Sequence, residues 1–280
     1  MNNYTVYEFF TKDEIERDWL VSILTDFDFD GYEETSESIK GFVPTGKVND
    51  EKVKGILSDN EFQHIDFSSK QLENKNWNEE WEKNFEPLVI AKQCYVRASF
   101  HPERPEYPYE VIINPKMSFG TGHHATTSLM LEYELETDMQ NKSVVDAGCG
   151  TGILSILAQK RGASVIKAFD IEDWAFENLI ENCNLNGCNR IETGQGTISQ
   201  IIQPEEQFDI VLANINKNVL LAEMDEYNKH LHTEGLLFLS GFYEEDEKDI
   251  LSCASDAGFR KESSKVKDRW MSMKLIKINE

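Results

Sequence analysis

A glycine-rich turn between an apolar strand and an apolar helix constrains this chain most. Residues 148–152, Gly-Cys-Gly-Thr-Gly, follow the strand-like run 143–147 and precede a helix predicted from Ile153 to Arg161. Glycines there let the backbone turn tightly and let a ligand approach without a Cβ in the way. The helix amides that follow can donate hydrogen bonds to it. By itself the cluster also fits a plain tight turn, and Ile153 stands where a dinucleotide fingerprint has its third glycine.

From about residue 125 onward, strands alternate with helices, which predicts a parallel sheet covered by helices on both faces. Predicted strands span 143–147, 165–170, 208–213 and 236–240, and a hairpin covers 260–278. Ligands bind such sheets outside the carboxyl ends of the strands. Asp170 ends the second of these strands, where a carboxylate can accept hydrogen bonds from ribose hydroxyls. The alternative is that Asp170 caps the next helix.

The first 70 residues predict a separate, small domain. Strand-like runs at 4–10, 27–32, 38–43 and 62–67 enclose two predicted helices, in the order of a ferredoxin-like split βαβ unit. Thr11 and Glu14 match a capping box for the first helix. Residues 71–90 predict a linker helix, because Trp77, Trp81 and Phe85 recur every four residues and form one stripe. Residues 91–280 then form the catalytic domain.

Composition excludes several functional classes. No window approaches the roughly 20 apolar residues of a membrane span, and the N-terminus lacks a secretory signal, so we expect a cytoplasmic protein. The net charge of −23 argues against a nucleic acid as the main partner. Residues 1–70 hold 16 acidic and 7 basic side chains. This balance would attract a basic protein, although a solvated acidic face explains it equally simply.

Two further segments indicate which protein family the chain resembles. Residues 114–127 read Asn-Pro-Lys-Met-Ser-Phe-Gly-Thr-Gly-His-His-Ala-Thr-Thr, and residues 209–215 read Asp-Ile-Val-Leu-Ala-Asn-Ile. Together with the glycine loop and Asp170, they resemble class I S-adenosylmethionine-dependent methyltransferases, and specifically the ribosomal protein L11 methyltransferase family. The pattern of that family is close to PGLAFGTGTHPTT, followed later by an ANI strand end. The resemblance spans nearly the whole chain and is most specific over 71–280.

This resemblance implies a Rossmann-like α/β methyltransferase sheet with a small N-terminal ferredoxin-like domain. It implies methylation of lysine side chains and of the N-terminal α-amine of ribosomal protein L11, free or on the ribosome, with S-adenosylmethionine as cofactor. We expect a monomer that recognises neither membrane nor nucleic acid directly. The resemblance implies that the cofactor contacts are Phe119, Gly120, Thr121, Thr127, Gly148, Gly150, Asp170 and Asn214. Asn214 would also hold the incoming amine and is the one catalytic residue expected.

Departures from the family pattern leave loop closure and substrate geometry open. Lys116-Met117-Ser118 replaces Gly-Leu-Ala, His123 replaces Thr, and Ala125 replaces Pro. No metal is expected, because the adjacent His123 and His124 seldom point to a common centre and no Asp or Cys lies nearby in sequence.

Two other functions compete with this interpretation. One is methylation of glutamine amides in release factors or of nucleic-acid bases. Enzymes of that kind usually carry an NPPY-like strand end, whereas this chain has Asn-Ile-Asn-Lys at 214–217. The other is a catalytically silent cofactor-binding or scaffold protein, against which the intact glycines, Asp170 and Asn214 argue.

Overall fold

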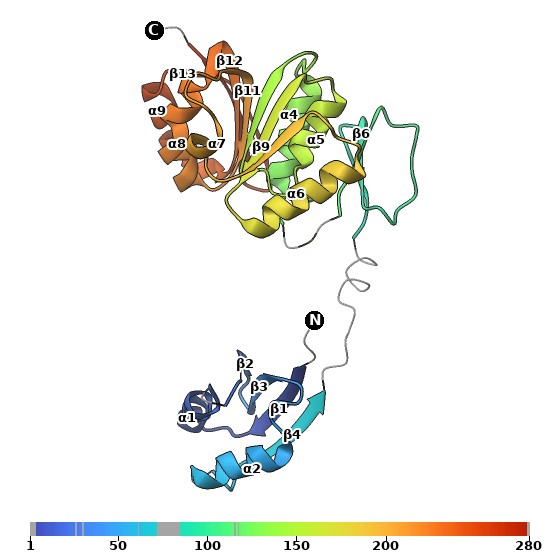
Figure 1. The fold of residues 1–280 in the computed structure, drawn as a ribbon. Helices are drawn as coiled ribbons and strands as arrows, with labels where there is room; N and C mark the ends of the chain where they lie inside the picture. Colours follow the sequence, from blue (N-terminus) through green and yellow to red (C-terminus); the bar gives the residue numbers. More distant parts are fainter. Residues whose placement is uncertain are drawn as a thin grey trace. The chain divides into compact units, whose positions relative to one another are not determined.

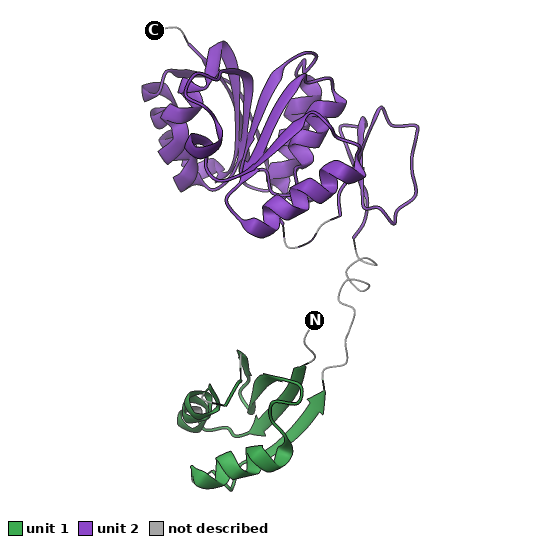
Figure 2. Ribbon diagram, viewed as in Figure 1, with its two compact units in different colours: residues 1–84 green, residues 85–280 purple. Residues whose placement is uncertain are grey.

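The computed structural model describes residues 4–25, 27–29, 31–60, 62–71, 85–114, 116 and 118–278. The chain divides into two compact units, residues 1–84 and 85–280 (Figure 2). Most of the linker helix expected over 71–90 falls on residues 72–84 and lies outside the described residues. At the end of that range, Leu88–Ile90 forms strand β5 of the second unit.

The first unit is a four-stranded antiparallel sheet with two helices. Its elements are β1 (Tyr4–Phe10), α1 (Glu14–Thr25), β2 (Gly31–Glu34), β3 (Ser38–Pro44), α2 (Asp50–Asp59) and β4 (Asp66–Gln71). The strand order β2-β3-β1-β4 is that of a ferredoxin-like fold, which confirms the prediction. Alternate side chains of β1, such as Tyr7 and Phe9, are buried in a core shared with Leu20 and Leu24 of α1.

Three local predictions in this unit are wrong. The strand expected at 27–32 is β2 at Gly31–Glu34, because a turn joins the Phe27 N–H to the Leu24 carbonyl. Helix α1 begins at Glu14, and its cap is Asp13, whose Oδ1 accepts from the backbone N–H of Ile15 at 2.8 Å. The chain leaves β1 extended for three residues, so Asp13 rather than Thr11 reaches the first helical amides. The last strand, expected at 62–67, is shifted to β4 because a turn joins the Ile65 N–H to the Phe62 carbonyl.

The second unit is built on a seven-stranded sheet in the order β10-β9-β8-β11-β12-β14-β13. The first five strands in this order are parallel, and β14 is antiparallel to both of its neighbours. The strands are β8 (Ser143–Ala147), β9 (Val165–Asp170), β10 (Ile191–Gln195), β11 (Phe208–Asn214), β12 (Leu231–Tyr243), β13 (Phe259–Lys267) and β14 (Trp270–Lys277). The order reverses between β8 and β11, and this Rossmann-like arrangement confirms the predicted sheet.

Helices cover both faces of this sheet (Figure 1). One face carries α4 (Ala125–Glu136), α5 (Ile153–Lys160) and α6 (Asp173–Leu185). The other carries α7 (Ile198–Ile201), α8 (Lys217–Lys229) and α9 (Glu247–Asp256), the last preceded by the short 3₁₀ turn Glu244–Asp246. Two apolar cores result, one on each face of the sheet. The sequence did not predict β10 or α7, and it gave no bounds for α4.

A three-stranded sheet of β5, β6 (Cys94–Arg97) and β7 (Tyr109–Ile112) extends this unit. The buried Arg97 donates to the carboxylate of Glu110 at 2.8 Å, so the charge inside the small sheet is paired. Within the described residues, no helix is both long and apolar enough to cross a membrane.

Candidate active site

A pocket of about 320 Å³ lies where the parallel strands of the second unit end. This is the edge at which open α/β sheets bind ligands, and it is the edge that the sequence predicts. Five residues singled out from the sequence line it, namely Phe119, Gly148, Gly150, Asp170 and Asn214. The other lining residues are His124, Thr126, Trp174, Ala175, Ile215, Asn216, Gly241 and Trp270.

The glycine loop requires glycine for two separate reasons. Gly148, Gly150 and Gly152 all have positive φ, at 67°, 53° and 78°, which L side chains adopt only with strain. There is also no room for a side chain at the first two. A Cβ on Gly148 would lie 2.2 Å from Cγ2 of Ile215, and one on Gly150 would lie 2.3 Å from the Phe119 carbonyl oxygen. The loop is therefore packed from both sides by backbone and side chains that shape the pocket.

The Phe119-Gly120 segment is hydrogen-bonded directly to this loop. The Phe119 carbonyl accepts from the backbone N–H of Thr151 at 2.9 Å, and the Gly120 carbonyl accepts from its hydroxyl. Of the segment's predicted cofactor contacts, only Phe119 lines the pocket. Gly120 lies against Thr151, and the Thr121 hydroxyl lies 3.3 Å from Nδ1 of His123.

Asp170 holds the loop while facing the pocket. One oxygen of its carboxylate accepts from the Gly150 N–H at 2.9 Å, and the other accepts from the Glu172 N–H at 3.1 Å. The alternative that Asp170 caps α6 is wrong, because the N-cap of this helix is Glu172 and, at this end of the helix, Asp170 bonds only the N–H of that residue; Asp170 lines the pocket. A carboxylate oxygen has lone pairs left after one such bond, so each can accept again from a ribose hydroxyl.

Asn214, at the end of β11, has a side-chain oxygen without a hydrogen-bond partner. Its Nδ2 donates to the Thr127 hydroxyl at 3.3 Å, whereas its Oδ1 is buried and has no hydrogen-bond partner. A buried acceptor without a partner costs free energy, which a ligand that donates a hydrogen bond would recover. Thr127 is itself fully buried on α4 and does not line the pocket, so it orients Asn214.

The two histidines serve different structural purposes. His123 lies outside the pocket lining, with its Nε2 2.8 Å from the Glu86 carbonyl and its ring against Phe85. His124 lines the pocket and caps α4, since its Nδ1 accepts from the Thr126 N–H. This bond leaves the proton of the neutral ring on Nε2. Burial lowers the pKa of His124, so the ring stays neutral.

Asp146 lies beneath the loop and does not line the pocket. It is buried, and its Oδ2 accepts from the backbone N–H and the hydroxyl of Ser155 in α5. Burial raises the pKa of Asp146 to about 6, against the opposing effect of the Ser155 hydrogen bonds. Burial also raises the pKa of the neighbouring Cys149 thiol, which makes it a packing residue rather than a nucleophile.

The aromatic wall of the pocket was not predicted from the sequence. The Trp270 ring lies 4.8 Å from that of His124, which in turn lies 5.1 Å from Phe119, measured between centroids. Trp270 opens β14, and nothing in the sequence marks the first residue of a hairpin strand as facing a ligand. Gly241 was predictable in principle, because it follows the buried end of a parallel strand. A Cβ there would meet the Ile215 carbonyl at 2.0 Å.

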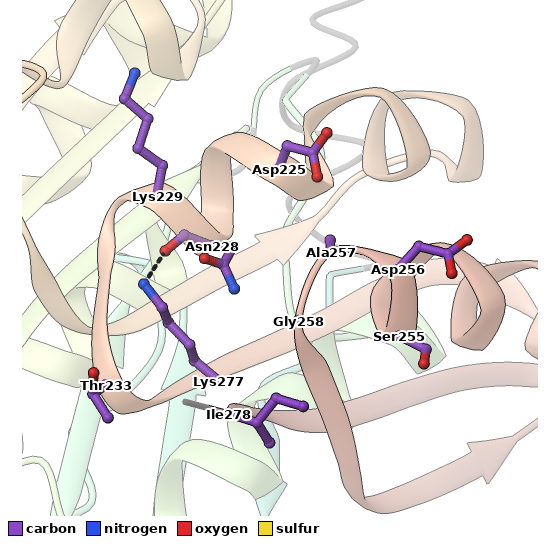
Figure 3. Close-up of a pocket in the computed structure, with 10 residues that line it drawn as sticks. All are labelled: Asp225, Asn228, Lys229, Thr233, Ser255, Asp256, Ala257, Gly258, Lys277 and Ile278. Carbon is purple, nitrogen blue, oxygen red and sulfur yellow. Dashed lines mark hydrogen bonds between the residues drawn. The ribbon is translucent and has the colours of Figure 1, made fainter. Parts of the chain in front are cut away.

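A larger hollow of about 940 Å³ lies elsewhere on the second unit, around the ends of α8, α9 and β14 and the start of β12 (Figure 3). It contains none of the residues predicted for the site. Both of its lysines are already engaged: Lys229 Nζ donates to Glu226 at 3.3 Å, and Lys277 Nζ donates to the carbonyls of Asn228 at 2.7 Å and Leu231 at 2.8 Å. Because Thr233 near the start of β12 lines it, this hollow lies at the amino-terminal edge of the parallel strands, and the pocket lies at the opposite edge.

The sheet order, the glycine loop and the carboxylate one strand later define a class I methyltransferase, an enzyme that uses S-adenosylmethionine. The sequence profile of the family described as ribosomal protein L11 methyltransferase (PrmA) matches residues 20–277. The chain belongs to this family.

Relatives match along almost the whole chain. The ribosomal protein L11 methyltransferase of Bacteroides fragilis is 39% identical over 269 residues, which cover 94% of this chain and 95% of its own. That of Porphyromonas gingivalis is 39% identical over 265 residues, 94% and 91% of the two chains. The crystal structure of ribosomal protein L11 methylase from Lactobacillus delbrueckii subsp. bulgaricus has a TM-score of 0.63 at 23% identity. It covers 70% of this chain and 100% of its own, and it supports the fold.

Proposed function

We propose that this chain methylates lysine side chains and the N-terminal α-amine of ribosomal protein L11. The observation that carries the proposal is the buried, unpartnered Oδ1 of Asn214, a residue that lines the pocket. A neutral amine can donate an N–H to this oxygen. The names of the relatives support the choice of protein substrate.

The residues around the pocket fit S-adenosylmethionine: Gly148 and Gly150 would hold its methionine part, and Asp170 would accept hydrogen bonds from its ribose. When bound, this cofactor supplies an activated methyl carbon. The apolar wall of Phe119 and Trp270 excludes water, and Thr127 fixes the amide of Asn214. Asn214 Oδ1 then accepts an N–H of the substrate amine and directs its lone pair along the line of attack.

The substrate must arrive as a neutral amine. A lysine has a pKa of about 10.4 and an α-amino group about 7.7 to 8.0, and removal from water lowers either value. With the cofactor bound, the lone pair of the amine would form the new bond to the methyl carbon as the carbon–sulfur bond breaks with its electron pair on sulfur, and the methylated nitrogen would then lose a proton to water. Asn214 is not a base, and His124 Nδ1 is occupied by the cap of α4, so the amine gives its first proton to solvent before it binds.

In this proposal the two units have different roles. Residues 1–70 recognise the protein substrate, and the second unit carries out methyl transfer. The enzyme acts as a monomer on L11, free or on the ribosome. The local acidity of residues 1–70, 16 acidic against 7 basic side chains, supports recognition of a basic protein.

Methylation of a planar amide or base is less well supported. The aromatic position of an NPPY-like strand end is Lys217 here, and its Nζ donates to Asp246 at 2.7 Å and Asp249 at 2.6 Å. Asn216 caps α8 by accepting from the Val219 N–H. Neither side chain is available to stack on a planar substrate.

The test is transfer of label from methyl-labelled cofactor to recombinant L11, followed by mass spectrometry of the product. We expect label on lysine residues and on the N-terminal amine of L11. L11 with a blocked N-terminus and arginine at every labelled lysine is the matched control and should remain unlabelled. Absence of label on normal L11, with enzyme that is folded and binds the cofactor, would contradict the proposal and favour a silent cofactor-binding protein.

A further inference from the structure

Helix α1 of the first unit has two apolar faces, and the fold uses only one of them. Leu20 and Leu24 are 1% and 0% exposed and belong to the core of this unit. Ile15 and Trp19, one helical turn apart, are 68% and 60% exposed. Since the inner face already attaches α1 to the sheet, the stability of the unit does not explain the outer one.

The outer face is a continuous stripe of four exposed residues. Ile15, Asp18, Trp19 and Ser22 follow the spacing i, i+3, i+4, i+7 and are all exposed. In the described part of the chain, three large hydrophobic side chains are at least 60% exposed, and two of them lie here. Tryptophan is the residue type most enriched among those that dominate binding energy at interfaces. We call these four residues the Trp19 face.

The sequence around this stripe is acidic. Between Lys12 and Asp28 the sequence holds six acidic residues and two basic ones. One of the two, Arg17, is buried and bonded to Glu34 and to the Thr11 carbonyl, so its charge is already matched. The Trp19 face is thus an apolar stripe within a negative field, which attracts a positively charged surface and repels a negative one.

Net charge indicates which partner can bind to the Trp19 face. Residues 1–84 carry 20 acidic and 9 basic side chains, and residues 85–280 carry 31 and 19, so both units are strongly negative. The catalytic unit of the same chain is therefore electrostatically mismatched to the Trp19 face. So is a second copy, whose net charge is −23. A protein that is methylated at lysine amines brings ammonium groups to its contact surface and is matched.

We propose that the Trp19 face docks the protein substrate, with Trp19 and Ile15 packing on its apolar surface and the surrounding carboxylates facing its lysines. This inference rests on the proposed function, because it takes the substrate to be ribosomal protein L11. It separates docking from chemistry, since the Trp19 face contains no residue that the pocket uses.

The test compares two substrates in the full-length enzyme. Trp19→Ala is expected to raise the KM for intact L11 at least about tenfold with kcat unchanged, as for a residue that dominates an interface. The rate on a short lysine peptide from L11, present at the same concentration for both enzymes, should stay unchanged. Val165→Ala in the second unit, where Val165 is 48% exposed, is the matched control and should leave both rates unchanged.

Each other outcome has a distinct meaning. Equal loss on L11 and on the peptide would overturn the inference, because Trp19 would then support folding or the active site. An unchanged KM for L11 would also overturn it. A change from dimer to monomer in light scattering, with the KM unaltered, would assign the face to a second copy instead. Failure of the proposed function is distinguishable, since wild-type enzyme would then transfer no label to L11 at all.

Discussion

Two hollows of the second unit lie at opposite edges of one sheet. They differ in whether their polar atoms already have hydrogen-bond partners. The larger, near Lys277, has the ammonium of that residue satisfied by two backbone carbonyls. The smaller, near Asn214, keeps a buried carbonyl oxygen without a partner beside glycines that admit no side chain. Volume therefore does not identify the functional site. Among the buried side-chain atoms without a hydrogen-bond partner in the described residues, only Asn214 Oδ1 belongs to a residue that lines the pocket, and a ligand that donates to it would recover free energy there.

The largest expected effect on cofactor affinity comes from substitution of Gly150, a residue of the glycine loop that lies against the Phe119 carbonyl. Gly150→Ala combines a strained φ of 53° with a Cβ placed 2.3 Å from a backbone oxygen, so we expect cofactor affinity to fall roughly several hundredfold. Calorimetric titration with S-adenosylmethionine measures it. Gly187→Ala is the matched control, because Gly187 has a similar φ of 63° with nothing within 4 Å. Equal loss in both variants would attribute the effect to strain alone.

Asp146 beneath the pocket should make stability depend on pH. Its pKa is raised from 3.8 to about 6, so the folded state binds the proton more tightly than the unfolded state. The contribution to stability is full below pH 3.8 and is lost as pH rises through about 6, by about 3 kcal/mol at 1.4 kcal/mol per unit. Urea unfolding of Asp146→Asn should therefore lose less stability than wild type over this range.

Asp209 provides a control of opposite sign for that measurement. Burial works against its charge, but hydrogen bonds from Ser143 hold the pKa of Asp209 below its usual value. Its contribution is present above the unfolded pKa and is lost as pH falls. Asp209→Asn should thus reduce the loss of stability toward acid. Parallel pH profiles for wild type and Asp146→Asn would contradict the burial argument for Asp146.

Asn214 should affect the chemical step more than binding. Asn214→Leu keeps the approximate volume but removes the unpartnered acceptor, so kcat should fall roughly a hundredfold while the cofactor dissociation constant changes little. Single-turnover methyl transfer and cofactor titration separate the two quantities. If kcat stays near that of wild type, the amine is held by another group and the proposed role of Asn214 is wrong.

Asp170 should affect binding more than chemistry. Asp170→Asn keeps the shape but replaces a charged acceptor of two backbone N–H groups, so we expect the cofactor to bind roughly twentyfold more weakly. Titration with cofactor, and with an analogue that lacks ribose hydroxyls, checks the assignment. An equal loss for both ligands would mean that Asp170 only supports the loop.

The smallest effect is expected at the other hollow. Lys277→Met removes the donor to two carbonyls and should reduce stability by about 1 kcal/mol without changing cofactor affinity or kcat. Thermal unfolding and the methyl-transfer assay measure both. Loss of activity in a fully folded variant would contradict the contrast between the two hollows.

Much of the fold follows from pattern alone. Strands β8 and β9 have the predicted bounds, because apolar runs bounded by glycine or aspartate leave little choice of register. The polar strand β10 and the four-residue helix α7 carry no such pattern and were missed. The cap of α1 was misplaced by two residues, because both Thr11 and Asp13 are good caps and only the path of the chain after β1 selects between them.

The sequence determined that the chain carries a glycine turn, a carboxylate one strand later and an Asn-Ile strand end, since these are local features of strands and turns. Only the tertiary structure decided which of them face the same pocket. It brought Trp270, Gly241 and His124 to the glycine loop and directed Thr127 to Asn214. It also left Trp19 outside the core. Such contacts join residues far apart in the chain, and their geometry depends on how helices and strands pack rather than on local preference.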